Sequence, residues 1–405
     1  MKTRVLILEQ QSYWGGAQRV LQTVLDTLRD QIEPLVALPE TGDFGCDLQK
    51  QGIETLAYPL GTYGSGHKSV RDMMAFGLRS VFCAALLARE IFRRRIQLVY
   101  INGPRCLPAG VMAAWLTGRP SLFSLHNTLS RRADVMLASR GAARVSKLIA
   151  CSQAAAAPLL KARPALAART QILYPPAEGS PSRTSRFEPQ AVRKSSQFVI
   201  GMVSRVTKAK GQHILLQAVA GLKPCSERRI VFLGAPAPGN VQDSGYLSSL
   251  RQSAVEQGLA DNVDWAGYQA DPHPYYDAMD VLAVPSVCEE GMPVVILEAF
   301  KHGVPVVASG TGGTPELVKD GLNGLLVPPG NPEDLGRALE RLQFEPGLRA
   351  RLAARARASI DQRFSKEHYC STIRDLISEL CASSAPVSRV LDWTETPADV
   401  PRLRD

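Results

Sequence analysis

The sequence predicts an α/β protein built from two doubly wound, Rossmann-like domains, and three observations lead to this fold class. Short apolar runs alternate with helical patterns along the chain, as expected of parallel strands joined by covering helices. The rhythm starts again near residue 198, after a segment rich in Pro and Ser. The length of 405 residues suits two domains better than a single core.

Residues 1–180 carry the pattern of the first domain. The opening strand is predicted at Arg4–Leu8, followed by a glycine turn at Gly15-Gly16 and a helix from Ala17 to Leu28. Such strand-turn-helix units lead into right-handed crossovers between parallel strands. Further strands of the same sheet are predicted at Leu35–Leu38, Leu98–Ile101, Ser121–Leu125 and Lys147–Cys151.

Residues 181–197 are predicted to be a linker, because they are rich in Pro, Ser and charge and poor in apolar side chains. Residues 198–370 repeat the pattern as the second domain, with helices predicted from Gly211 and Pro293. Residues 371–405 are predicted to form a C-terminal helix and tail, for which crossing back to the first domain is one option. The second-domain strands are predicted at Phe198–Val203, Ile230–Leu233, Val263–Ala266, Val281–Val284, Val304–Val307 and Gly324–Val327.

The charge of the chain is unevenly distributed. The formal net charge is +9, but residues 1–194 hold 26 basic and 13 acidic side chains, whereas residues 195–405 hold 21 and 25. A positive first half predicts an acidic partner: nucleic acid, anionic lipid or a phosphorylated substrate. The sequence shows no helix-turn-helix, zinc-finger or aromatic RNA-binding pattern, so nucleic acid is disfavoured.

The cysteines and the apolar stretches indicate in which cellular compartment the protein is expected. No two of the 8 cysteines have CxxC spacing, which disfavours a zinc site. The first ten residues lack the apolar region of a signal peptide, so we expect reduced thiols and a cytoplasmic protein. The apolar stretch from Met73 to Ile91 is interrupted by charged residues, which disfavours a spanning helix but leaves a surface-lying amphipathic helix open.

Two loops after predicted strands have the chemistry of anion sites. Gly15 and Gly16 permit close backbone approach just before a helix N-terminus; the alternative is a tight turn without a ligand. Arg205 and Lys210 flank the loop after the strand at 198–203. A guanidinium and an ammonium there would bind a diphosphate and stabilise it as a leaving group; the alternative is a solvated basic loop.

The segment 285–299 carries two carboxylates separated by seven residues. Glu290 is predicted in a loop, and Glu298 about a turn into the helix that follows Pro293. Carboxylates so spaced can bind hydroxyls at two points of an elongated ligand, and sugar hydroxyls are natural partners. The alternative is a buried structural Glu298 with Glu289 and Glu290 solvated, but an unpaired buried carboxylate is costly.

Two further motifs follow predicted strands. The segment 310–316, with Gly312, Gly313 and Thr314, predicts a second cradle of backbone amides or, alternatively, a flexible turn. His126 ends a first-domain strand, and the clefts of such sheets lie at strand carboxyl ends. Its alternative is an ordinary hydrogen-bonded histidine.

The order of these motifs resembles retaining glycosyltransferase family 4, whose members have the GT-B fold, over about residues 1–375. The block at 285–335, which begins PSVCEEGMPVVILEAF, is similar to the Glu-x7-Glu segment and the glycine elements of that family. GMVSRVTKAKG resembles the family's diphosphate loop, and YYDAMDVLAVPS its strand leading to the Glu loop. WGGAQRV and SLHN are similar to its first-domain glycine loop and histidine. The x7 spacing alone is weak, but five elements in order are specific.

The resemblance implies transfer of a sugar with retention from a UDP- or GDP-sugar to a saccharide or lipid-linked saccharide, in polysaccharide or glycoconjugate biosynthesis, with no metal or other cofactor. The implied catalytic residues are His126, Arg205, Lys210 and Glu290. The two cations would bind the donor diphosphate, Glu290 the donor sugar and Glu298 the ribose. The other implied donor-binding residues are Gly15, Gly16, Gly291, Met292, Pro293, Val294, Gly312, Gly313 and Thr314.

One departure from the family pattern leaves the donor sugar open. Where the family often has Gly-Phe-Gly, this chain has Gly291-Met292-Pro293, and Pro293 has no amide hydrogen to donate. Two alternatives keep the fold: a sugar-phosphate synthase or phosphorylase, and a non-catalytic nucleotide-sugar-binding protein. The retained cations and carboxylates argue against the second.

The charge excess lies in the domain that, by the resemblance, faces the acceptor. It is concentrated in Arg71–Arg95 and Arg131-Arg132, where apolar residues share the segment. We therefore expect peripheral contact with the inner face of the cytoplasmic membrane and an acidic or lipid-linked acceptor. The alternative is a packed helix with a solvated basic face.

Overall fold

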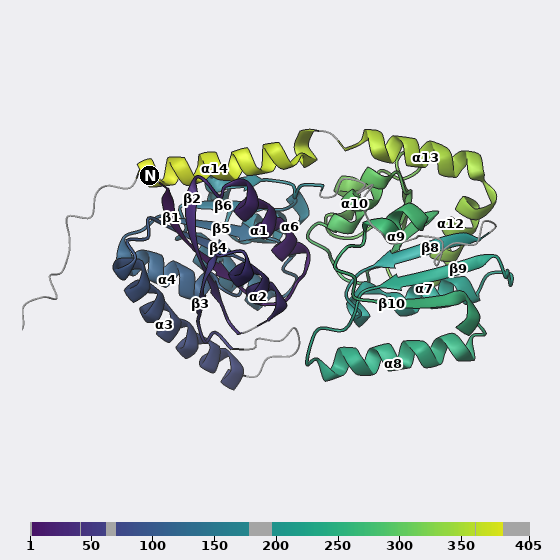
Figure 1. Ribbon diagram of the computed structural model, residues 1–405, viewed down its shortest axis with the longest axis horizontal. Coiled ribbons are helices and arrows are strands. Elements are labelled where there is room, and N and C mark those ends of the chain that lie inside the picture. Colours follow the sequence, from purple (N-terminus) through teal and green to yellow (C-terminus); the bar gives the residue numbers. More distant parts are fainter. Residues whose placement is uncertain (1, 41, 62–69, 178–196, 361, 384–405) are drawn as a thin grey trace, which may run out of the picture.

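The computed structural model describes residues 2–40, 42–61, 70–177, 197–360 and 362–383. Nearly all of the predicted linker at 181–197, and the predicted tail beyond residue 383, lie outside the described residues. The described chain forms two α/β domains, each with a parallel sheet covered by helices (Figure 1). The predicted fold class is confirmed.

The sheet of the first domain has seven strands in the order β3-β2-β1-β4-β5-β6-β7. The chain builds outward from β1 through β2 to β3 and then returns to β4, so the order reverses between β1 and β4. Strands β4 and β5 are buried along their whole length, and β1 is buried from Val5 onward, because helices cover both faces of such a sheet. The strands are β1 (Thr3–Glu9), β2 (Ile32–Leu38), β3 (Glu54–Ala57), β4 (Leu98–Asn102), β5 (Ser121–Leu125), β6 (Lys147–Ala150) and β7 (Thr170–Ile172).

The second domain repeats this arrangement with six strands in the order β10-β9-β8-β11-β12-β13. Its order reverses between β8 and β11, and the loops that follow these two strands carry Arg205, Lys210 and Glu290. The strands are β8 (Phe198–Val203), β9 (Arg228–Leu233), β10 (Val263–Gly267), β11 (Val281–Val284), β12 (Val306–Ser309) and β13 (Leu325–Val327).

The helices lie on both faces of each sheet. In the first domain they are α1 (Gly16–Thr27), α2 (Asp43–Lys50), α3 (Val70–Arg93), α4 (Leu107–Thr117), α5 (Arg132–Ala142) and α6 (Gln153–Ala162). Those that follow are α7 (Gln212–Ala220), α8 (Val241–Glu256), α9 (His273–Ala278), α10 (Val294–His302), α11 (Thr314–Leu317), α12 (Pro332–Phe344), α13 (Pro346–Ala358) and α14 (Lys366–Ala382). No helix in the described ranges is both long enough and apolar enough to cross a membrane.

Two edge strands and several strand boundaries differ from the sequence prediction; for example, β2 begins at Ile32 and not at Leu35. Strands β3 and β7 were not predicted, because ETLA and TQI are short and only partly apolar. The strand predicted at Val304–Val307 instead begins at Val306. Pro305 has no amide hydrogen for the ladder, although its carbonyl accepts from the Leu282 amide at 3.0 Å.

The last helix, α14, lies along the first domain, whereas α13 covers the second (Figure 1). Tyr369 and Cys370 are buried there in one cluster with apolar residues of β1 and α1. An ion pair of 3.3 Å joins Lys147 to Glu379 on the same helix. The crossing helix begins five residues before the domain boundary expected at 371, and it ties the two domains together.

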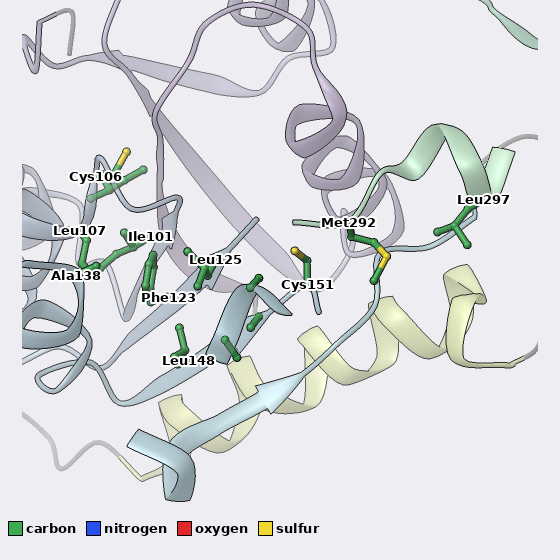
Figure 2. Packing of buried hydrophobic residues seen from close by; sticks show 14 of the residues in the cluster. Ile101, Cys106, Leu107, Phe123, Leu125, Ala138, Leu148, Cys151, Met292 and Leu297 are labelled. Atoms are coloured by element: carbon green, nitrogen blue, oxygen red, sulfur yellow. The ribbon is translucent and has the colours of Figure 1, made fainter. Parts of the chain in front are cut away.

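A buried apolar cluster also continues from one domain into the other. Cys151 and Leu125 of the first domain belong to the same cluster as Met292 and Leu297 of the second (Figure 2). Burial of this kind contributes roughly 25 cal/mol for each Å² of apolar surface removed from water. The cluster therefore helps to hold the two domains in contact.

Candidate active site

A cavity of about 830 Å³ lies between the two domains. Its first-domain wall comes from the loops after β1 and β5, and its second-domain wall from the loops after β8 and β11 and the start of α10. Ligands of doubly wound sheets bind at such carboxyl ends, where the strand order reverses. The predicted site residues that line the cavity are Gly15, Gly16, His126, Arg205, Lys210, Glu290, Gly291, Met292, Pro293, Val294 and Glu298.

Gly211 fixes the loop that carries Lys210. Its φ of 81° lies in the left-handed region, and a Cβ atom there would stand 2.0 Å from the carbonyl oxygen of Pro285. Only glycine satisfies both conditions without strain. The close approach brings the loop after β8 against the loop after β11.

Lys210 and Glu290 consequently form an ion pair in the cavity wall. The Lys210 Nζ atom lies 2.5 Å from Glu290 Oε1, and the Ser286 hydroxyl donates to the same oxygen at 2.6 Å. Both charged side chains are largely shielded from solvent. Two charges at this spacing neutralise each other in the absence of ligand, and a bound anion would find the ammonium already oriented.

The loop of Glu290 and Gly291 rests on the first domain. A Cβ atom on Gly291 would stand 2.1 Å from the carbonyl oxygen of His126. The Gly291 carbonyl accepts from the Ser152 hydroxyl at 2.6 Å, and the Glu290 carbonyl accepts from Thr128 Oγ1 at 3.2 Å. These contacts place the Glu290 carboxylate and the His126 ring on facing walls of one cavity.

Glu298 is buried in α10 and lines the cavity. The Tyr276 hydroxyl donates to its Oε2 atom at 2.7 Å. Burial raises the pKa of Glu298 above its usual value, an effect that the Tyr276 hydrogen bond opposes. The carboxylate therefore retains a partner on one side, as a buried acid requires.

Gly312, Gly313 and Thr314 do not line the cavity, unlike the other predicted site residues. They lie behind the Glu290 loop, and the Gly313 amide donates to the Glu290 carbonyl at 2.9 Å. The expected amide cradle thus supports the loop and does not face the ligand space. The sequence pattern did not reveal this, because a glycine turn that binds an anion and a glycine turn that packs against another backbone segment have similar sequences.

Glu316, at the end of the same segment, joins the domains. Its carboxylate accepts from the backbone amides of Gln153 and Ala154, at 3.0 and 2.8 Å, and from the Tyr174 hydroxyl at 3.1 Å. The two amides open α6, where the partial positive charge of a helix N-terminus favours an anion.

His126 is held by a polar network that reaches the end of β1. Its Nε2 atom lies 2.6 Å from Asn102 Oδ1, and the Asn102 amide donates to Glu9 Oε2 at 2.5 Å. An amide oxygen only accepts, so His126 carries its proton on Nε2. Burial lowers the pKa of His126 to about 4, which leaves the ring neutral at neutral pH.

Glu9 is the buried acid at the base of this network, and sequence reasoning missed it. Its Oε1 atom accepts from the backbone amides of Gln10 and Gln11 and from Gln18 Nε2, at 2.7, 3.1 and 2.9 Å. Burial raises its pKa to about 7 in spite of these bonds. The available signal was a lone carboxylate ending the apolar run RVLILE, at the carboxyl end of a central strand.

Glu9 should make stability depend on pH. Because burial raises the folded-state pKa of Glu9 from its ordinary value of 4.5 to about 7, the folded state holds this proton more tightly than the unfolded chain does. The free energy of unfolding should then fall by about 3 kcal/mol as pH rises from about 4.5 to about 8. Glu9→Gln lacks the titrating group, so chemical denaturation of both proteins should show their stability difference changing by that amount. A difference independent of pH would contradict the assignment.

In the ranges that the structure describes, no three or more His, Cys, Asp and Glu side chains gather in a metal-binding arrangement. All 8 cysteines lie in these ranges as free thiols.

Comparison with known proteins matches both halves of the chain. The model of the family described as "Glycosyltransferase Family 4" matches residues 14–178, and that of "Glycosyl transferases group 1" matches residues 184–359. The lipopolysaccharide core biosynthesis glycosyltransferase LpsE of Rhizobium meliloti is 34% identical over 185 residues, or 46% of this chain and 50% of that protein. The D-inositol 3-phosphate glycosyltransferase of Salinispora arenicola is 30% identical over 265 residues, or 62% and 58%. The chain thus matches about half the length of these curated relatives.

The solved structure of Anabaena HepE with UDP-glucose extends the match to nearly the whole chain. It is 28% identical, covers 93% of this chain and 99% of that chain, and superposes with a TM-score of 0.79. HepE has also been solved with UDP. With a glycosyltransferase model matching each half and both sheets arranged as in GT-B enzymes, the chain belongs to the glycosyltransferase superfamily and has the GT-B fold.

Proposed function

We propose that this protein is a retaining glycosyltransferase that moves a sugar from a UDP- or GDP-sugar to a saccharide or lipid-linked saccharide, without a metal. The observation that carries the proposal is the meeting of the Lys210–Glu290 pair and Glu298 in one cavity between the domains. The cavity volume is in the range of small-molecule and cofactor sites. The retaining course is supported by the resemblance of the 285–335 segment to family 4.

The second domain would bind the donor. Lys210 and Arg205 would contact the diphosphate, and the Lys210 ammonium can keep its bond to Glu290 because it has three donors. Glu298 would accept from ribose hydroxyls at the buried end of the cavity. The structures of HepE with UDP and UDP-glucose favour a uridine donor as the first to test.

The proposed reaction needs no residue to remove a proton. The bond from the anomeric carbon to the phosphate oxygen breaks with its electron pair going to the phosphate, whose negative charge Lys210 and Arg205 stabilise. The acceptor hydroxyl attacks from the same face, and its proton passes to that phosphate oxygen. A neutral His126 suits this course, because it does not repel the positive charge developing on the sugar.

The first domain would face the acceptor. Gln10 and Arg105 line its side of the cavity together with His126. An acceptor bearing phosphate or another acidic group would meet the Arg105 guanidinium there. We also propose that the enzyme is cytoplasmic and acts at the inner face of the cytoplasmic membrane.

Nucleotide release provides the test. The protein is incubated with UDP- and GDP-sugars, alone and with saccharides, sugar phosphates and lipid-linked saccharides, and nucleoside diphosphate is measured. We expect one donor class to be consumed faster in the presence of a saccharide acceptor. Consumption only with sugar phosphates would indicate a synthase, whereas no release and no nucleotide binding would overturn the enzyme proposal.

A further inference from the structure

The helical layer formed by α3, α4 and α5 exposes an unusual amount of apolar surface to solvent. Of the large apolar residues exposed in the described ranges, ten lie on these three helices, and the others are scattered over the second domain. Soluble proteins expose single apolar residues routinely, but gathered ones mark a contact surface. We call these ten the apolar face: Met73, Met74, Leu78, Val81, Phe82, Phe92, Trp115, Leu116, Met136 and Leu137.

Helix α3 shows the feature most clearly, because it is apolar on two opposite sides. Its inward side, which includes Phe76, Leu87 and Ile91, is buried in the domain core. Its outward side carries Leu78 at 72% and Phe82 at 57% exposure, spaced four residues apart. A solvated helix face normally carries polar residues there.

Arginines accompany the apolar face. The stretch 70–95 contains six arginines and two acidic residues, and 131–144 contains four arginines and one acidic residue. Glu90 already pairs with Arg93 and Arg94, at 2.6 and 2.8 Å. The surface therefore combines apolar anchors with excess positive charge, which is the chemistry that recognises an anionic lipid surface.

Helix α3 approaches the proposed acceptor side of the cavity through Arg79. Arg105, which lines the cavity, donates a hydrogen bond to the Gly61 carbonyl. Gly61 also lies against the Arg79 guanidinium of α3, because a Cβ atom on this glycine would stand 2.6 Å from Arg79 Nη1. A membrane seated on α3 would thus bring lipid headgroups near the acceptor entrance.

We propose that the apolar face of α3, α4 and α5, with its arginines, docks the protein on an anionic membrane. Docking itself does not depend on the proposed function. Only its role, which is to bring the protein to a lipid-linked acceptor, rests on that function. Burial of Leu78 and Phe82 would add hydrophobic binding, and the arginines would add electrostatic attraction to the charged surface. The alternative occupant, a second copy of the chain, would bury the same residues in solution.

Vesicle flotation tests the proposal with phosphatidylcholine vesicles that contain or lack phosphatidylglycerol. We expect binding to the anionic vesicles, weakening at high salt. The double variant Leu78→Ser/Phe82→Ser should bind at least about tenfold more weakly. Its matched control is Val241→Ser/Phe344→Ser, which removes two exposed apolar residues from the second domain and should bind like wild type. Equal binding by the two double variants, or none by wild type, would overturn the proposal.

Two further readouts separate this proposal from its rivals. Brominated lipids should quench Trp115, and Trp115→Phe should remove that quenching. Light scattering without vesicles should show a monomer. If it instead showed a dimer that dissociates in Leu78→Ser/Phe82→Ser, the apolar face would bind a second copy of the chain and not a membrane. Leu78→Ser/Phe82→Ser should release nucleotide from soluble donor and acceptor at the wild-type rate. Absence of nucleotide release in wild type with intact vesicle binding would refute the proposed function and leave the docking surface standing.

Discussion

Replacing Lys210 with alanine is expected to lower kcat by about 10²- to 10³-fold, because the leaving diphosphate would lose a preoriented positive charge. The same change leaves Glu290 without the ion pair seen at 2.5 Å, so the carboxylate would also repel the diphosphate. Steady-state nucleotide release, with substrate concentrations varied, measures the effect.

Lys208 offers a matched control for this experiment. It lies in the same short 3-10 helix, Lys208–Lys210, but is exposed and does not line the cavity. Lys208→Ala should keep the wild-type kcat. If Lys210→Ala kept the wild-type kcat, Lys210 would have no role in the reaction. If Lys208→Ala and Lys210→Ala lowered kcat equally, the effect would come from overall charge and not from the position of Lys210.

Glu298→Ala is expected to lower kcat/KM by about 10- to 100-fold, as loss of a hydrogen bond to a charged group does when the partner remains. The effect should fall chiefly on the KM for donor, because the carboxylate would bind ribose, which does not react. Circular dichroism and thermal unfolding check that the fold survives the cavity left beside Tyr276, whose hydroxyl bonds to Glu298 at 2.7 Å.

Two substitutions sharpen the Glu298 experiment. Glu298→Gln keeps the shape but loses the charge, and Glu289→Gln removes an exposed carboxylate from the neighbouring loop as the matched control. Since burial raises the pKa of Glu298, donor affinity in wild type should increase as pH rises through that pKa. The pH dependence should be absent in Glu298→Gln. A wild-type KM in Glu298→Ala would contradict the ribose contact.

The fold could be predicted from the sequence because its central strands are buried on both faces. Runs such as RVLILE and FVIGMV have no alternation, and only covered parallel strands read that way. Strands β3 and β7 escaped prediction because they lie at sheet edges, where a short segment pairs on one side only. Their positions are set by neighbours, through backbone hydrogen bonds that leave little trace in side-chain type.

The candidate site could be predicted in part, for a related reason. Lys210 and Glu290 follow strands β8 and β11, which are neighbours at the point where the strand order reverses, so motif position already implied their proximity. Glu9 was missed because its significance depends on burial beside Gln18 and on a hydrogen bond from Asn102, which lies 93 residues further along the chain. Gly313 was predicted to face the ligand for the same reason, because the neighbouring sequence does not show that this glycine packs against the backbone of Gly291.

The central claim is retaining transfer by Lys210 and Glu290 in the cavity between the domains, and the anomeric configuration of the product tests it most directly. With UDP-glucose, or whichever α-linked donor is consumed, the purified product is examined by proton NMR. The account predicts an α-linked product, identified for glucose by the small coupling of its anomeric proton, and little product from Lys210→Ala. A β-linked product, or equal product from wild type and Lys210→Ala, would contradict it.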